Sequence, residues 1–194
     1  MNTINYDRLF PSLVTYCDKP ELINDNVVIK AKEILRENQE KPFYSQCIST
    51  VNKELHILDL PEFKNIRVFI VDLIQAYCDL QKFKSLEMMF QSSWLNLYNV
   101  HGYQDLHTHH DSMLSGVFYL KSSGEKDLIF QAPWHFFQAC FPEYTESTLE
   151  NCHNVEYESV IGRCYIFPSH LMHRTLPAKS ERISLSFNVQ YARP

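Results

Sequence analysis

The stretch from Arg182 to Val189 alternates strictly between polar and apolar residues, and this pattern constrains the fold most. Side chains of an extended chain point alternately to two faces. The polar face carries Arg182, Ser184, Ser186 and Asn188, and the apolar face carries Ile183, Leu185, Phe187 and Val189. The pattern predicts a β-strand with one face on a core. The polar face could meet water, as in many antiparallel sheets, or Arg182 and Ser184 could hold a buried ligand carboxylate.

The same period of two recurs throughout the chain from Met88 onward. It predicts strands at 93–98, 115–120, 128–130, 155–160, 163–167 and 182–191. Two helical stripes precede them, one between 27 and 35 and a broader one between 61 and 80, ending at Leu80. We expect a mainly β protein with some α structure: a double-stranded β-helix, or cupin-like jelly roll, with the helices on one outer face.

A chain of 194 residues is long enough for one domain with a sizeable core. We expect a single domain over 1–194, with helical support at 20–90 and the jelly-roll core at 91–194. Residues 2–16 favour a short strand at a sheet edge, because Pro11 lacks a backbone donor.

Charge and cysteine content exclude several classes of partner. The net charge is −5 and the chain has no long basic run, so we expect no nucleic-acid partner. Six cysteines without a CxxC pair, and no recognisable leader, indicate reduced thiols and a cytoplasmic protein. No apolar run reaches the ~20 residues of a membrane helix, so no membrane partner is expected. A homodimer stays open.

Residues 107–111, His-Thr-His-His-Asp, place three imidazoles and a carboxylate within five positions. Imidazole and carboxylate are the usual protein ligands of iron and zinc. On a strand, His107, His109 and Asp111 share one face, so the first two metal ligands could be His107 with His109 or His109 with Asp111. A third ligand must come from a distant segment, and His173 is the candidate.

Several short segments together resemble the iron(II)- and 2-oxoglutarate-dependent oxygenases, in particular a group of small members from bacteria and phages. These segments occur in the group's order and span nearly the whole chain. They are Leu9-Phe10-Pro11, Ser93-Trp94-Leu95-Asn96, His107-x-His109, residues 115–120, Phe167-Pro168-Ser169 with His173, and residues 182–188.

The resemblance implies that iron(II) is bound by His107, His173 and a second ligand that is either His109 or Asp111. The wider superfamily uses His-x-Asp before its distal histidine, whereas this group shows His-x-His. The present sequence fits both patterns, and the His-x-His motif of the group favours His109.

The resemblance also implies a cosubstrate site. Arg182 follows His173 by nine residues, a spacing similar to that of the family's prolyl hydroxylases, and would bind the far carboxylate of 2-oxoglutarate. Ser184 and the hydroxyl of Tyr119 would add hydrogen bonds, and Asn96 is a further cosubstrate contact. The implied cofactors are iron(II), 2-oxoglutarate and dioxygen. The implied reaction is hydroxylation of a C–H bond in a small molecule, an amino acid or a peptide, with release of succinate and carbon dioxide and without a catalytic protein base.

Two alternatives from other classes remain at this stage. A three-histidine, cupin-like dioxygenase would use no 2-oxoglutarate, and Arg182 would then be a structural ion-pair partner. A non-catalytic module would bind a metal or a small acid without turnover. The region 130–154, which contains Trp134, Phe136 and Phe137, is rich in aromatic residues and could be a loop over the core or a substrate lid.

Overall fold

A computed structural model describes residues 12–38, 41–42, 45–84, 87–122, 124–133 and 143–191. Its α-helices are α1 (Asp25–Glu37) and α2 (Lys64–Leu80), with short 3-10 helices at Pro20–Leu22, Ile57–Asp59 and Pro61–Phe63. The strands are β1 (Thr15–Asp18), β2 (Ile48–Ser49), β3 (Met88–Tyr98), β4 (Gln104–His107), β5 (Leu114–Lys121), β6 (Lys126–Gln131), β7 (Asn154–Glu158), β8 (Arg163–Pro168), β9 (His173–Thr175) and β10 (Arg182–Tyr191).

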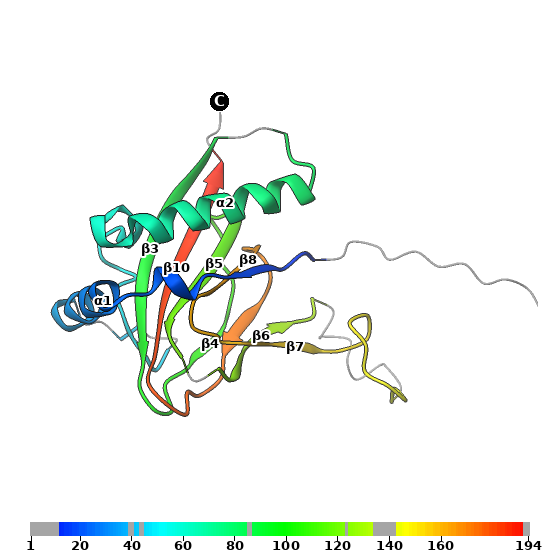
Figure 1. Ribbon diagram of the computed structural model, residues 1–194. Coiled ribbons are helices and arrows are strands. Elements are labelled where there is room, and N and C mark those ends of the chain that lie inside the picture. Colours follow the sequence, from blue (N-terminus) through cyan, green and yellow to red (C-terminus); the bar gives the residue numbers. More distant parts are fainter. Residues whose placement is uncertain are drawn as a thin grey trace, which may run out of the picture.

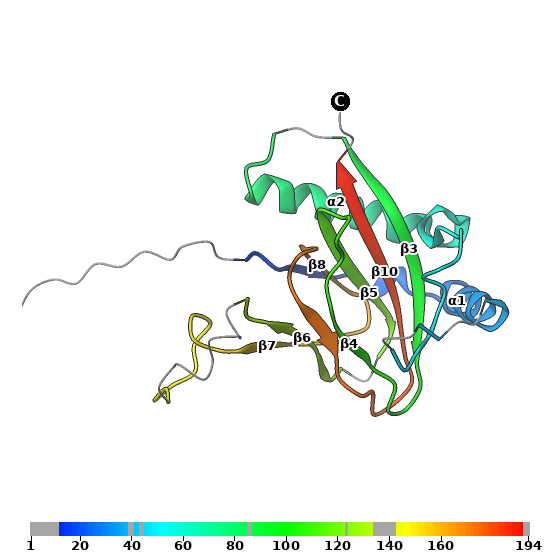
Figure 2. The ribbon, with the colours of Figure 1, turned by 180° about the vertical axis from the view of Figure 1, so that it is seen from behind.

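The strands form two antiparallel sheets that pack as a double-stranded β-helix (Figure 1, Figure 2). The larger sheet has six strands in the order β1-β8-β5-β10-β3-β2, and the smaller has four in the order β4-β9-β6-β7. Except for β3 with β2 and β6 with β7, neighbouring strands in each sheet are not consecutive in the chain. The jelly roll expected from the alternating pattern is therefore confirmed.

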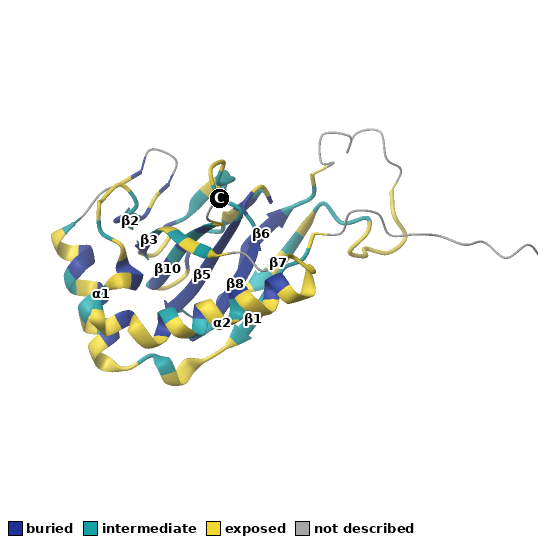
Figure 3. Ribbon diagram, turned by 90° about the horizontal axis from the view of Figure 1, so that it is seen from above, coloured by how far each residue is buried: buried dark blue, intermediate teal, exposed yellow. Residues whose placement is uncertain are grey.

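Both helices cover the outer face of the six-stranded sheet, and their exposed residues face away from it (Figure 3). Helix α1 begins after Asn24, whose side chain accepts a hydrogen bond from the backbone N–H of Val27 at 3.1 Å. Ile34 of α1 and Ile70 of α2 join one buried cluster with Leu185 of β10. Leu80, expected in the helical stripe, is instead 63% exposed because it lies at the C-terminal end of α2.

The alternation of β10 divides its side chains between two environments. Ile183 and Leu185 pack in the cluster beneath the helices, whereas Arg182 and Ser184 line a cleft shared with residues of the four-stranded sheet. The polar face of β10 therefore faces into the jelly roll, where Arg182 and Ser184 are buried and Ser186 and Asn188 are partly exposed. Gly116 on the neighbouring β5 admits the ring of Phe187, because a Cβ at Gly116 would lie 2.2 Å from Phe187 Cζ.

The strand expectations differ from the structure mainly at short elements. Strand β3 begins at Met88, five residues before the expected start. Strands β4 and β9, with four and three residues, were not expected because a period of two is not readable over so few positions. Strand β1 is an edge strand paired with β8, but it begins at Thr15 and overlaps the expected range 2–16 only at Thr15 and Tyr16; residues 1–11 lie outside the described residues.

The described residues show two further features. None of their helices is long and apolar enough to cross a membrane. The five cysteines among them, Cys17, Cys47, Cys78, Cys152 and Cys164, carry free thiols.

Candidate active site

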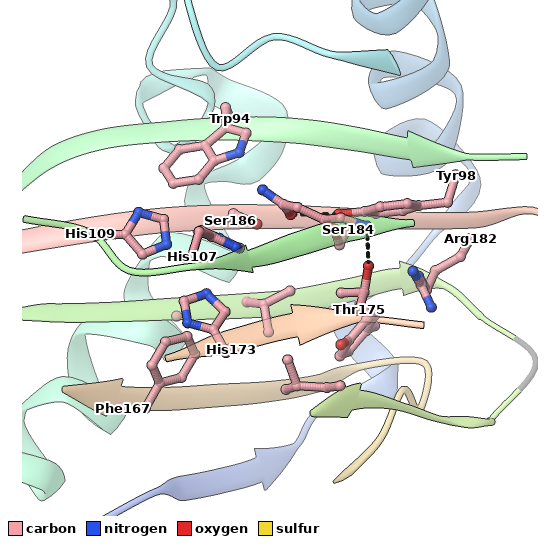
Figure 4. A pocket seen from close by; sticks show the side chains of 15 residues that line it. Trp94, Tyr98, His107, His109, Phe167, His173, Thr175, Arg182, Ser184 and Ser186 are labelled. Atoms are coloured by element: carbon pink, nitrogen blue, oxygen red, sulfur yellow. Dashed lines mark hydrogen bonds between the residues drawn. The ribbon is translucent and has the colours of Figure 1, made fainter. Parts of the chain in front are cut away.

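Three histidines lie close together in the cleft between the two sheets (Figure 4). His107 ends β4 and His173 begins β9, and the antiparallel register of these two strands places the residues opposite each other. His109 follows two residues later, where its backbone N–H donates to the carbonyl of Ser169 at 3.0 Å. The potential ligand atoms of the three side chains lie within 4.8 Å of one another. That separation is suited to a single metal ion.

Backbone carbonyls orient two of the three rings. The Nδ1 atom of His107 lies 2.7 Å from the carbonyl oxygen of Asp105, and Nδ1 of His173 lies 2.8 Å from that of Leu171. In both cases the acceptor is two residues earlier in the chain. A carbonyl cannot donate, so a neutral ring must carry its proton on Nδ1 and its lone pair on Nε2, the form in which histidine binds metals.

All three imidazoles are held in the neutral form. Burial is the main cause: it lowers the pKa of His107, lowers that of His173 far below the usual value, and lowers that of His109 to about 4. A charge on His107 further disfavours a charge on His109 and His173, and a charge on His109 does the same to His173. At neutral pH none of the three rings is protonated on both nitrogens, so protons do not compete with a metal ion for the cluster.

Asp111 lies elsewhere. It is exposed in the turn that follows His109, and the group of potential metal ligands among the described residues comprises His107, His109 and His173. The geometry thus favours His109 over Asp111 as the second ligand.

Arg182 lies deeper in the same cleft and is only 2% exposed. Its guanidinium forms an ion pair with Asp127 of β6 and lies over the ring of Tyr98, 4.2 Å from the centroid. Its Nε and Nη2 atoms have no hydrogen-bond partner within the described part of the chain. Buried donors left without acceptors are costly, so these two atoms mark a place for an additional acceptor such as a ligand carboxylate.

Tyr119 and Ser184 also line this cleft, opposite each other across β5 and β10. Burial raises the pKa of Tyr119, so its hydroxyl remains a protonated donor. Asn96, by contrast, is already hydrogen-bonded within the protein: Ser49 Oγ donates to its Oδ1 at 2.7 Å, and its Nδ2 donates to Ser186 Oγ at 3.1 Å. Asn96 lines a neighbouring cavity and is not among the residues that line the Arg182 cleft.

Comparison with known proteins agrees with this geometry. Residues 92–188, half of the chain, match the model of the family described as "Putative 2OG-Fe(II) oxygenase". The chain belongs to this family of iron(II)- and 2-oxoglutarate-dependent oxygenases. The protein is therefore an oxidoreductase whose cofactor is iron(II) and whose cosubstrates are 2-oxoglutarate and dioxygen. The matched region contains every site residue expected from the sequence.

Solved structures similar to this oxygenase share its fold at low sequence identity. A Pseudomonas putida prolyl-4-hydroxylase is 15% identical with a TM-score of 0.63, covering 93% of this chain and 92% of the other. A viral collagen prolyl hydroxylase from Paramecium bursaria Chlorella virus 1, in complex with 2-oxoglutarate, is 15% identical with a TM-score of 0.54, covering 93% and 96%. HygX from Streptomyces hygroscopicus, with nickel, 2-oxoglutarate and hygromycin B, is 14% identical with a TM-score of 0.55, covering 90% and 82%. No curated protein matches the sequence.

The oxygenase has a second, larger cavity beside the Arg182 cleft. The cleft has a free volume of about 30 Å³ and the second cavity about 230 Å³. The two cavities share Trp94, Gln104, His107 and His109 in their walls, so they meet at the histidine cluster. The rest of the described lining of the second cavity consists of Pro42, Cys47, Ser49, Val51, Ser92, Asn96, Thr108 and Asn188, without an acidic residue, a lysine or an arginine.

Sequence reasoning missed several residues at the oxygenase's site. Asp127 precedes an apolar run and gave no sign that it pairs with Arg182, which lies far away in sequence. Gln104 and Thr175 belong to the short strands β4 and β9, and the backbone N–H of Gln104 donates to Thr175 Oγ1 at 3.0 Å. Thr175 could have been found, since it shares a strand face with His173. The expected aromatic lid falls largely on residues 134–142, which lie outside the described residues.

Proposed function

We propose that His107, His109 and His173 bind the iron(II) of this oxygenase and that Arg182 binds the far carboxylate of 2-oxoglutarate. One observation carries the proposal: three neutral imidazoles converge in the same cleft as a buried arginine that has two unpartnered donors. A facial set of three ligands leaves coordination positions open for a bidentate cosubstrate and dioxygen. Asp127 supplies only part of the hydrogen bonding of Arg182, so the ion pair by itself does not account for the guanidinium.

The remaining residues of the cleft fit the same role. Tyr119 and Ser184 would donate hydrogen bonds to the carboxylate that Arg182 holds. The free volume of the cleft is about 30 Å³, which corresponds to one or two water molecules. The exposure of the cleft to water is limited on the histidine side by Trp94 and Phe167, whose rings lie 5.8 Å from His109 and 4.8 Å from His173.

Iron(II) and 2-oxoglutarate together supply the oxidising chemistry, in which dioxygen is consumed, succinate and carbon dioxide are released, and a C–H bond of the primary substrate is hydroxylated. The residues of this chain hold and orient these groups and exclude water from them. No side chain in the cleft is needed as a general base.

The second cavity is the place we propose for the primary substrate, because it meets the cosubstrate cleft at His107 and His109. Its described lining offers hydroxyl and amide groups and no side chain that carries a fixed charge. An ionised substrate group would lose its hydration there without gaining a counter-charge. We therefore favour a neutral polar substrate group. The related structures named above include prolyl hydroxylases and an enzyme that holds hygromycin B, so both a peptide residue and a small molecule are compatible.

A product assay tests the proposal. The protein is incubated aerobically with iron(II), ascorbate and 2-oxoglutarate, and succinate is measured with neutral amides and alcohols, with carboxylic acids and with amines as candidate substrates. We expect iron-dependent succinate formation that neutral polar compounds stimulate most. Iron-dependent oxidation of a substrate without succinate would instead indicate a three-histidine dioxygenase that does not use 2-oxoglutarate. Stimulation only by charged compounds would overturn the substrate class and leave the cosubstrate assignment intact.

A further inference from the structure

His109 is oriented differently from the other two histidines of the cluster. Its Nδ1 atom faces no backbone carbonyl among the contacts seen for the described residues, and lies 3.4 Å from Nδ2 of Asn188 on β10. Asn188 belongs to the polar face of β10, together with Arg182 and Ser184, and it lines the second cavity. One strand therefore carries both the carboxylate-binding arginine and the neighbour of a metal ligand.

Asn188 is itself held by a buried pair of serines. Ser115 Oγ donates to Asn188 Oδ1 at 2.8 Å and also lies 2.8 Å from Ser169 Oγ. Ser115 is 1% exposed and Ser169 is fully buried. Strand β3 carries one extra residue opposite this point, because Asn188 pairs with Ser92 and Val189 pairs with Phe90. The amide is thus fixed in place from the side opposite to His109.

The orientation of this amide decides whether His109 can bind a metal. If Nδ2 donates to the ring, Nδ1 must accept, and the neutral ring then carries its proton on Nε2. Neither nitrogen would have a lone pair for a metal ion. If the amide turns by 180°, Oδ1 accepts a proton from Nδ1 and the lone pair lies on Nε2, as in His107 and His173.

The serine pair permits either orientation. Both hydroxyls can donate or accept, so Ser115 can donate to Oδ1 in one arrangement or accept from Nδ2 in the other, and Ser169 can take the remaining hydrogen bond. In either orientation Ser169, Ser115 and Asn188 each keep at least one hydrogen bond along this chain.

We propose that Asn188 is a positioning residue for the metal centre, and that its Oδ1 accepts the Nδ1 proton of His109 when the metal is bound. The inference rests on the proposed role of His109 as a ligand. Asn188 would then do for His109 what the backbone carbonyls of Asp105 and Leu171 do for His107 and His173. For His109 the acceptor comes from a side chain, because His109 lies beyond the end of β4.

Three variants separate the acceptor role from simple packing. Asn188→Asp keeps an acceptor and removes the donor, Asn188→Leu removes both, and Gln190→Leu is a matched control on the same face of β10, two residues further on. The affinity for cobalt(II), a spectroscopic substitute for iron(II), is measured by titration without 2-oxoglutarate. The tautomer of His109 is read in the zinc(II)-loaded protein from the ¹⁵N shifts of its ring.

We expect the cobalt(II) affinity to fall about 10- to 100-fold in Asn188→Leu, the usual effect of losing such a partner of a metal-binding histidine, and to be retained in Asn188→Asp and Gln190→Leu. Zinc-loaded wild type and Asn188→Asp should show the Nδ1–H form of His109. Wild-type affinity in Asn188→Leu would overturn the positioning role. An equal loss in Asn188→Asp would overturn the acceptor assignment. Should the leucine variant fail to fold, Asn188→Ala gives the same comparison without added bulk. A wild type that binds no cobalt(II) would instead refute the metal centre itself.

Discussion

Arg182 on β10 and Asp127 on β6 form an ion pair in which both residues are almost fully buried. The pair links the two sheets at the inner end of the Arg182 cleft. Removal of one partner from a buried pair leaves an uncompensated charge, which is far more costly than loss of an exposed ion pair. The pair therefore has consequences for both stability and ligand binding.

Asp127→Asn should destabilise the protein, by roughly 3–5 kcal/mol, because Arg182 keeps its charge without a counter-ion. Added 2-oxoglutarate brings a carboxylate to the same guanidinium, so its stabilising effect should be larger in the variant than in wild type. Thermal denaturation with and without 2-oxoglutarate measures both effects.

Asp18→Asn is the matched control for this prediction. Asp18 pairs with Arg163, but its side chain is 45% exposed, so the loss should be no more than about 1 kcal/mol. An Asp127→Asn variant as stable as wild type would show that Arg182 does not depend on this partner.

Arg182→Lys should weaken 2-oxoglutarate binding more than iron(II) binding, since a point charge replaces a planar fork of donors. The loss of one charge-assisted hydrogen bond costs about 1.5–3 kcal/mol, which corresponds to roughly a ten- to hundredfold rise in the dissociation constant. Isothermal titration under nitrogen gives both constants, and Arg163→Lys serves as control, because Arg163 pairs with Asp18 away from the cleft. An unchanged constant for 2-oxoglutarate would remove Arg182 from the site.

His107→Ala and His173→Ala should each abolish tight iron(II) binding and leave a folded domain, because both side chains line a cleft and lie outside the large core beneath the helices. His109→Ala should behave similarly. The exposed neighbours His110 and Asp111 provide controls, since neither belongs to the cluster. Metal content after dialysis and circular dichroism report the two outcomes. Full metal binding in His109→Ala together with loss in Asp111→Ala would reverse the assignment of the second ligand.

The stability of the metal-free protein should depend on pH through the buried imidazoles. The pKa of His109 is about 4 in the folded protein and about 6.5 for a solvated histidine, so below about pH 6.5 the unfolded state binds more protons. The free energy of unfolding should therefore fall between about pH 6.5 and 4, by up to about 1.4 kcal/mol per pH unit for this residue. His109→Gln should show a shallower decline in urea denaturation. Equal slopes in the two proteins would contradict a buried neutral ring.

The fold was predictable from the sequence where a strand is long enough for its alternation of buried and polar residues to be recognised. Strand β10 alternates over ten residues, so its core face and its polar face could both be assigned from the sequence, and the polar residues Arg182 and Ser184 do line the site. Strands β4 and β9 have too few residues for such a pattern, although they carry His107 and His173. Their positions follow from pairing between distant segments.

The sequence predicted which residues belong to the candidate site, but not which other residues contact them. Imidazole is a common metal ligand, so the cluster of histidines identified His107 and His109 as candidate ligands from the sequence alone. The resemblance already favoured His109 over Asp111, and the structure adds that Asp111 lies exposed in the turn after His109. Asp127 and the role of Asn188 needed tertiary structure, because each depends on a contact across separate strands. Asn96 was expected to contact the cosubstrate. It lies on β3 near the cleft, but its amide is already hydrogen-bonded to Ser49 and Ser186.

The central claim is that one cleft binds iron(II) through the three histidines and 2-oxoglutarate through Arg182. Anaerobic titration of 2-oxoglutarate into the iron(II)-loaded protein, followed by visible absorption, tests this claim most directly. We expect a metal-to-ligand charge-transfer band that saturates at one equivalent, requires both components, is absent in His173→Ala and needs more 2-oxoglutarate in Arg182→Lys. A wild-type protein that binds iron(II) and develops no such band, or an Arg182→Lys variant that titrates like wild type, would contradict it.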